Sequence, residues 1–169
     1  MARSPFIADI VALRRHQGHR EQLMVHAPLP GLRVTGSEVP AGEAVDLELV
    51  LEAVEGGIVV TGTAGAAWSG ECRRCLQPVG GRVTADVEEL FVRDSEEGET
   101  YPIGGDHIDL EPLARETVVL ALPMAPLCRA DCAGLCPTCG ADLNRGPCGC
   151  PLPDVDPRWA ALDALRRKP

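Results

Sequence analysis

The residues of this 169-residue chain whose type and spacing could do chemistry are its eight cysteines. They occur as four close pairs: Cys72 and Cys75, Cys128 and Cys132, Cys136 and Cys139, Cys148 and Cys150. Thiolates are soft ligands, and two of them from one short turn supply half of a tetrahedral zinc site at little entropic cost. The four pairs therefore predict two structural zinc sites, each with four cysteine ligands.

Local spacing indicates how the pairs combine. The last two pairs lie within "CPTCGADLNRGPCGC", whose glycines and proline turn the chain back on itself, so they are expected to share a site. The prediction is site 1 with Cys72, Cys75, Cys128 and Cys132, and site 2 with Cys136, Cys139, Cys148 and Cys150. The alternatives are an interleaved grouping of 72–75 with 136–139, an iron–sulfur cluster, disulfides and free thiols.

A closed shell of four cysteines indicates a structural role. It leaves no open coordination position, and four thiolates donate so much charge to zinc that it activates water poorly. Cys136-Pro-Thr-Cys139 has the spacing of a redox pair, but it lacks the strand–helix setting of a thiol oxidoreductase. We therefore expect a protein that is not an enzyme and has no small-molecule substrate, with a thiol redox enzyme or a nuclease as the weaker alternative.

The charge of the chain is negative and uneven. The net charge is −9, yet residues 1–35 carry five arginines against two carboxylates, and residues 157–169 carry four cations against one. The acidic residues between them should attract basic partners and repel a phosphate backbone. Contact with nucleic acid or a partner would then fall to six cations: Arg73, Arg74, Arg158, Arg166, Arg167 and Lys168. The alternative roles are to balance thiolate charge between the ligands and to complement a helix dipole at the tail.

The start of the chain, "MARSPFIADIVALRRHQ", lacks the long apolar run and the small-residue cleavage site of a signal peptide. No apolar run approaches the length of a membrane span. We therefore expect a cytoplasmic protein without membrane contact, in a compartment where thiols stay reduced.

Hydrophobic periodicity predicts an α+β fold with a mostly antiparallel β N-terminal half, either a sheet or a partly open barrel. Period-two alternation predicts strands at 20–27, 44–54, 58–71 and 82–93, the last with a bulge at Glu88–Glu89. The "CRRC" turn lies at the tip of the hairpin between the last two strands. Residues 4–17 suit a short helix capped by Ser4, with a strand at Phe6–Ala8 as the alternative.

The period changes to that of a helix after Asp109, which can cap a central amphipathic helix that Pro123 ends. A final helix is expected from Asp156, with Trp159 among its inward residues. We divide the chain into a β-rich domain with the central helix, 1–122, and a zinc-binding segment with the C-terminal helix packed on it, 123–169. Aromatic residues are only 3% of the chain, so the core is thin and metal sites would compensate.

The order of these motifs resembles a known family. A β-rich half, the hairpin "CRRCL", a helix ending "LALPMAPLC", then "GLCPTCGADLN", "CGC" and "DPRWAALDAL" are similar to the YceD-like proteins, also called large ribosomal RNA subunit accumulation proteins. The resemblance runs from about residue 5 to 167 and is most specific in "GLCPTCGADLN" and the "DPRW" segment.

The resemblance implies a cytosolic or plastid protein that promotes accumulation of large-subunit ribosomal RNA. It also implies a gene beside that of a small, basic, zinc-ribbon-type protein of the large ribosomal subunit, and no established catalytic residues. Some family members lack the second cysteine cluster, which makes site 2 auxiliary. The expected partners are therefore a ribosomal protein of the large subunit, large-subunit ribosomal RNA, or both. A zinc-ribbon adaptor of another cytosolic complex is the alternative function.

Overall fold

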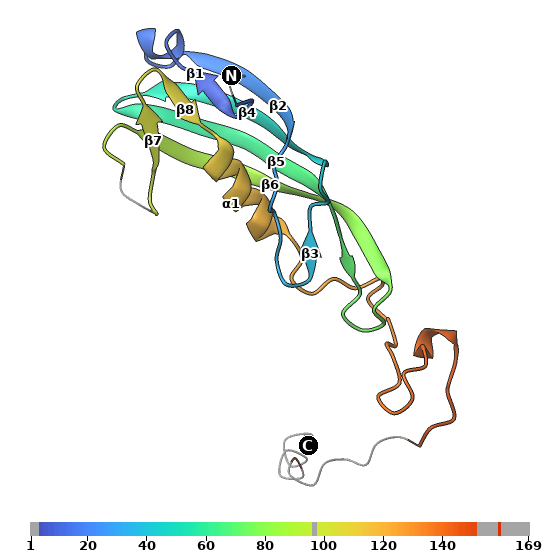
Figure 1. Ribbon diagram of the computed structural model, residues 1–169. Helices are drawn as coiled ribbons and strands as arrows, with labels where there is room; N and C mark the ends of the chain where they lie inside the picture. The colour runs from blue at the N-terminus through green and yellow to red at the C-terminus, as the bar shows by residue number, and fades with distance from the viewer. Residues whose placement is uncertain (1–3, 96–97, 152–158, 160–169) are drawn as a thin grey trace.

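The computed structural model describes residues 4–95, 98–151 and 159. Within these ranges the strands form one sheet that curls like half of a barrel, in the order β1-β8-β7-β6-β5-β4-β2, and β3 pairs with β5 (Figure 1). The strands are β1 (Ile7–Asp9), β2 (Arg20–Pro28), β3 (Ser37–Glu38), β4 (Ala44–Val54), β5 (Gly57–Glu71), β6 (Pro78–Val92), β7 (Tyr101–Gly104) and β8 (His107–Asp109). Neighbouring strands are antiparallel except β6 and β7, so the predicted α+β class with a mostly antiparallel half is confirmed.

The long strands β2, β4, β5 and β6 form because their residues alternate between an apolar and a polar face. The inward positions of β4 and β5 are buried as predicted: Val45, Leu47, Leu49, Leu51, Ile58, Val60, Ala64 and Ala66. The outer face of these strands carries half-buried and exposed side chains, many of them acidic. The sheet therefore has one face packed on the core and one face open.

The bulge predicted at Glu88–Glu89 is wrong. The pairing of β5 with β6 keeps one register along its whole length. Phe91 is fully buried and continues the inward face of β6, whereas Leu90 and Val92 are half-buried on the outer face. The apparent change of period in the sequence therefore comes from apolar residues on both faces near the end of the strand.

The helix predicted for residues 4–17 is also wrong, and the alternative of a strand near Phe6 is correct. Ile7–Asp9 pairs with β8, and only the 3-10 turn η1 (Leu13–Arg15) follows. The segment alternates, with Phe6, Ala8 and Ile10 buried. The free edge of β8 supplies backbone partners, and this tertiary contact outweighs the helical signal of the local sequence.

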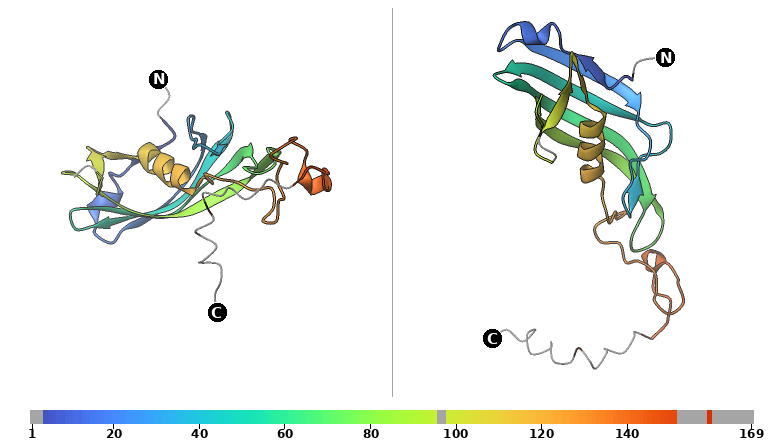
Figure 2. Two further views of the ribbon diagram at one scale, coloured as in Figure 1. Left: turned by 90° about the horizontal axis from the view of Figure 1, so that it is seen from below. Right: turned by 60° about the vertical axis from the view of Figure 1, so that its left-hand side comes forward.

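Helix α1 (Glu111–Ala121) lies in the hollow of the curled sheet (Figure 2). It buries Leu113, Ala114 and Val118 against the strands, as the amphipathic pattern predicts. The carboxylate of Asp109 accepts a hydrogen bond from the Glu111 N–H at 2.9 Å, which satisfies one of the free amides at the start of the helix.

The cysteine-rich segment, residues 123–151, leaves α1 and extends beyond the end of the sheet where the β5–β6 hairpin turns (Figure 1). Its regular structure is the short turn η2 (Leu143–Arg145). The predicted final helix lies outside the described residues, apart from Trp159. Trp159 is 61% exposed, and the packing of the final helix stays a prediction. In the part of the chain that the structure covers, no helix has the length and hydropathy needed to cross a bilayer.

Candidate metal centres

The structure brings the eight cysteines together in two groups of four. Site 1 holds Cys72, Cys75, Cys128 and Cys132, and site 2 holds Cys136, Cys139, Cys148 and Cys150. In each group all four sulfur atoms lie within 4.8 Å of one another, so each could hold a metal ion. The interleaved grouping is wrong, because the β5–β6 hairpin meets the segment directly after α1.

The spacing of the sulfurs in site 1 matches a single tetrahedral ion. The Sγ atoms of Cys72 and Cys132 are 3.8 Å apart, and those of Cys75 and Cys128 are 3.7 Å apart. A tetrahedron with zinc–sulfur bonds of about 2.3 Å has edges of about 3.8 Å. A disulfide would bring two sulfurs to about 2 Å. Four sulfurs this close also leave no room for a cluster of several iron atoms. The donor set and its size therefore fit one zinc ion.

Both sites are built on the same backbone turn. In site 1 the Leu76 N–H donates to the Cys72 carbonyl at 2.9 Å, and the Cys72 N–H donates to Gln77 at 2.8 Å. In site 2 the Gly140 N–H donates to the Cys136 carbonyl at 2.9 Å, and the Cys136 N–H donates to the Ala141 carbonyl at 2.8 Å. The two hydrogen bonds therefore have the same lengths and the same positions relative to the cysteines as in site 1. The residue after each second cysteine has left-handed backbone geometry, with φ of 59° at Leu76 and 73° at Gly140. Glycine adopts this geometry freely, whereas leucine is strained in it.

The pKa values of the cysteines differ within each group, and they indicate what a bound cation would change. A hydrogen bond from the backbone of Cys128 lowers the pKa of Cys72 to about 6, although burial opposes it. Backbone amides of its own turn lower the pKa of Cys136 to about 6. Burial and neighbouring sulfurs raise the pKa of the Cys128 thiol to about 12, and neighbouring sulfurs do the same for Cys150. One thiolate in each group thus suppresses ionisation of another, and a divalent cation between them would remove that penalty.

Asn144 connects the two sites, a role that cysteine spacing alone does not reveal. It lies in η2, within the loop of site 2, yet its amide Nδ2 donates to the sulfur of Cys132 in site 1 at 3.5 Å. Its Oδ1 accepts from the Ala133 N–H at 2.9 Å and from the Arg129 guanidinium at 2.6 Å. The signal available in the sequence is "GADLN", whose Asp142 forms the Asx turn that holds Asn144.

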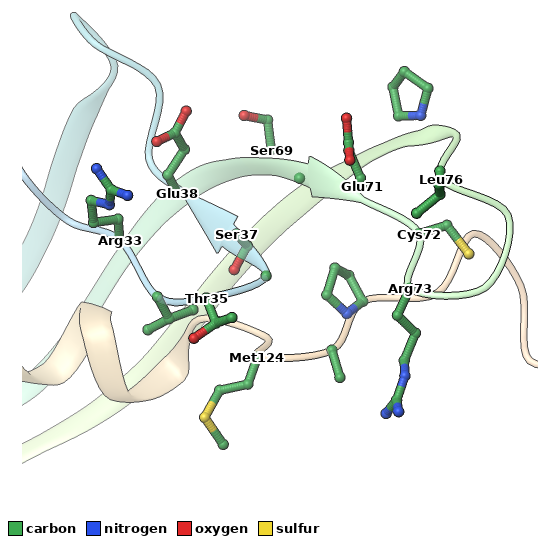
Figure 3. Close-up of a pocket in the computed structure, with 16 residues that line it drawn as sticks. Arg33, Thr35, Ser37, Glu38, Ser69, Glu71, Cys72, Arg73, Leu76 and Met124 are labelled. Atoms are coloured by element: carbon green, nitrogen blue, oxygen red, sulfur yellow. The ribbon is translucent and has the colours of Figure 1, made fainter.

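The two arginines between the ligands of site 1 have different surroundings. The Arg74 guanidinium donates to the carbonyls of Cys132 and Ala130, at 2.9 and 3.3 Å, and so ties the hairpin to the cysteine-rich segment. Arg73 is exposed and lines a groove of about 840 Å³ beside the site (Figure 3). The apolar side chains of Leu76 and Met124 are exposed at the same groove. The other predicted cations, Arg158, Arg166, Arg167 and Lys168, lie outside the described residues.

Comparison with known proteins places this architecture in a family. The family described as "Large ribosomal RNA subunit accumulation protein YceD" matches residues 60–166, a range that begins in β5 and includes both cysteine groups. An uncharacterised protein of Mycobacterium tuberculosis (strain H37Rv) is 41% identical over 94% of this chain and 80% of its own length. An uncharacterised protein of Mycobacterium leprae is 35% identical over 94% of this chain and 76% of its own.

A more distant relative carries a descriptive name. The "large ribosomal RNA subunit accumulation protein YCED homolog 1, chloroplastic" of Arabidopsis thaliana is 28% identical over 54% of this chain and 34% of its own length. No solved structure matches the chain.

Proposed function

The chain belongs to the YceD family, and on that premise we propose that it is a non-catalytic ribosome-assembly factor. In this proposal it promotes accumulation of large-subunit ribosomal RNA by binding a basic protein of the large subunit. The family description and the name of the plant relative support a ribosome-related role. The observation that carries the choice of partner is the charge of the described surface.

That surface is acidic over most of the sheet. Carboxylates of β4 and β6 stand on the open outer face, and they outnumber the cations there, Arg20 and Arg82, each of which pairs with an aspartate or glutamate. At site 1 the Arg74 guanidinium donates to two backbone carbonyls, whereas Arg73 has no ion pair with any residue that the structure describes. Such a surface attracts a lysine- and arginine-rich protein and repels RNA phosphates. Direct binding of precursor ribosomal RNA through the basic tail is the competing outcome.

In the same proposal both cysteine groups bind zinc, and zinc is structural. Site 1 joins a hairpin of the sheet to the segment after α1, so the ion would hold the 123–169 segment on the 1–122 domain. Structural zinc contributes folding free energy directly, because the unfolded chain lacks the preformed site. We further propose that the protein acts in the cytoplasm, where its thiols remain available for metal.

Two measurements test the proposal: affinity capture of the protein from cells, and the cellular ratio of large- to small-subunit ribosomal RNA. Tagged protein is isolated from cells with half of the sample treated with RNase, and the ratio of large- to small-subunit ribosomal RNA is measured with and without the gene. We expect a basic large-subunit protein to remain bound after RNase, and the ratio to fall without the gene. Loss of every ribosomal protein after RNase would favour RNA binding, and an unchanged ratio would refute a role in accumulation.

The same cells test the metal sites. Mass spectrometry of the native protein should find two zinc ions, and Cys72→Ser should lose one of them and fail to restore the ribosomal RNA ratio. Cys139→Ser makes the matched change in site 2, and it shows whether the second ion is auxiliary. Metal-free protein that is equally stable would refute the zinc proposal.

A further inference from the structure

Among the described residues, most of one side of strand β6 has no strand beside it. Strand β6 pairs with β5 from Pro78 to Val92, but on its other side β7 pairs only with Phe91 and Val92. Along residues 78–90 no other strand pairing is present among the described residues. At about 3.4 Å per residue this open edge is about 40 Å long. A strand edge carries free N–H and C=O groups in a row, which can pair with an added strand.

The space beside this edge is bounded by groups that an added strand would contact. The Tyr101 hydroxyl of β7 donates to Glu116 of α1 at 2.6 Å. This side of the helix therefore faces the position next to β6, which β7 occupies only beside Phe91 and Val92. Leu120 is one helical turn further along the same side, and it is 86% exposed. Figure 1 shows α1 extending past β7 over the lower part of the sheet. An exposed apolar side chain therefore lies on the side of α1 that carries Glu116, the side that faces the position next to β6.

The charges along the edge define what would bind there. Asp86 and Glu88 are exposed on the outer face of β6, two residues apart, and no ion pair of either is present within the described residues. Between them Val87 points inward, and the half-buried Val83 and Ala85 precede it on the inner face. A strand laid on this edge would meet carboxylates at alternate positions and small apolar side chains between them.

We propose that the open edge of β6 binds an extended segment of a partner protein that has lysine or arginine at alternate positions and small apolar residues between them. Main-chain hydrogen bonds would supply affinity, and the alternating side chains would supply specificity. The cations would lie opposite Asp86 and Glu88, and the apolar residues would lie under Leu120. This edge proposal makes the proposed function more specific. It rests on that function only for the identification of the partner as a ribosomal protein.

Two other occupants are less suited to the edge. A second copy of the chain would bring another acidic protein of charge −9 to the same carboxylates, so its approach would be repelled. RNA would bring phosphates to Asp86 and Glu88 and has no backbone that pairs with a strand edge. The charge of the edge therefore favours a basic polypeptide.

The test uses the full zinc-loaded chain and a labelled eight-residue peptide in which lysine or arginine alternates with valine or threonine. A second peptide has proline in place of a central valine, which removes one main-chain donor. We expect the first peptide to bind at about 0.15 M salt and the second at least tenfold more weakly. The variant with Asp86→Lys and Glu88→Lys should lose at least tenfold in affinity. Glu48→Lys is the matched control, because Glu48 lies in the same row as Asp86 but on β4, inside the sheet.

Hydrogen exchange identifies the binding mode. The amides of β6 that point away from β5 should exchange quickly in the free protein and become protected when the peptide binds. Leu120→Gln should weaken binding, and Met24→Gln should not, because Met24 is 78% exposed on β2 at the far side of the sheet. Protection of other amides, equal loss in Glu48→Lys, or the same protection by single-stranded RNA would overturn the proposal. Protection that grows with protein concentration alone would assign the edge to a second copy and also overturn it.

These outcomes separate the edge from the function. If the peptide fails to bind while cells without the gene still lose large-subunit ribosomal RNA, the edge proposal falls and the function stands. If the peptide binds as expected while the ribosomal RNA ratio is unchanged, the edge is a binding site and the ribosomal role is wrong.

Discussion

Replacing Asn144 with alanine is expected to weaken zinc binding at site 1, although Asn144 lies in the loop of site 2. The change removes the amide that donates to the Cys132 sulfur at 3.5 Å and the acceptor of the Ala133 N–H at 2.9 Å. Loss of a hydrogen bond to a metal ligand typically reduces metal affinity 10- to 100-fold. At about 1.4 kcal/mol for each factor of ten, we expect a loss of about 2 kcal/mol, or about 30-fold.

The assay must report the two sites separately. The protein is loaded with ¹¹³Cd, which gives one NMR signal for each four-cysteine site, and a chelator is titrated against both. In Asn144→Ala the site 1 signal should disappear at about 30-fold less chelator than in the parent, whereas the site 2 signal should shift much less. Thr138→Ala is the matched control, because Thr138 is exposed in the turn of site 2. Among the described residues its side chain forms no hydrogen bond to a cysteine sulfur.

Two results would refute this reasoning. If both signals weakened equally, Asn144 would act by holding the whole segment rather than through Cys132. If neither changed, the amide would contribute nothing to the metal ligand. Asn144→Asp separates the two parts of the interaction further. It keeps an acceptor for the Ala133 N–H but replaces the donor with a carboxylate, so it should lower site 1 affinity at least as much as alanine.

Three further changes test the turn, the core and the outer face. Leu76→Gly should raise the free energy of unfolding of the zinc-loaded protein by about 0.5–1 kcal/mol in urea, because leucine has φ of 59° there; a decrease would show that the leucine is unstrained. Phe91→Ala should lower that free energy by about 3–5 kcal/mol, since the ring is fully buried and stacks on a neighbouring tyrosine, and a loss below 1 kcal/mol would contradict the packing described. Hydrogen bonds from His26 and then Arg82 hold the pKa of Asp46 below its usual range. The contribution of the ionised Asp46 carboxylate to the free energy of unfolding is therefore complete above the unfolded pKa of about 3.9. It is lost as the pH falls through the lower pKa of the folded protein. The difference in urea midpoint between the parent and Asp46→Asn should be present at neutral pH and vanish in strong acid, and a constant difference would exclude the ionised carboxylate as its cause.

Much of the fold and of the metal-binding chemistry could be predicted from the sequence, because these features depend on local pattern. Alternation of apolar residues predicts β4 and β5, and the helical period predicts α1 with its buried side. Cysteine pairs at short spacing predict two groups of four, since residues in one turn must lie together. The same reasoning fails at Glu88–Glu89, where apolar residues on both faces of β6 imitate a bulge.

Only the tertiary structure decided the features that depend on neighbours distant in sequence. The edge of β8 makes the segment at Ile7–Asp9 a strand, because backbone groups of another element satisfy its hydrogen bonds. The chain path after α1 brings Asn144 to the sulfur of Cys132, which no spacing rule contains. The open edge of β6 exists because the parallel strand β7 begins only at Tyr101, beside Phe91 near the end of β6, and runs away from residues 78–90. Spacing along the chain determines which residues share a turn, whereas contact between turns depends on how the whole chain packs.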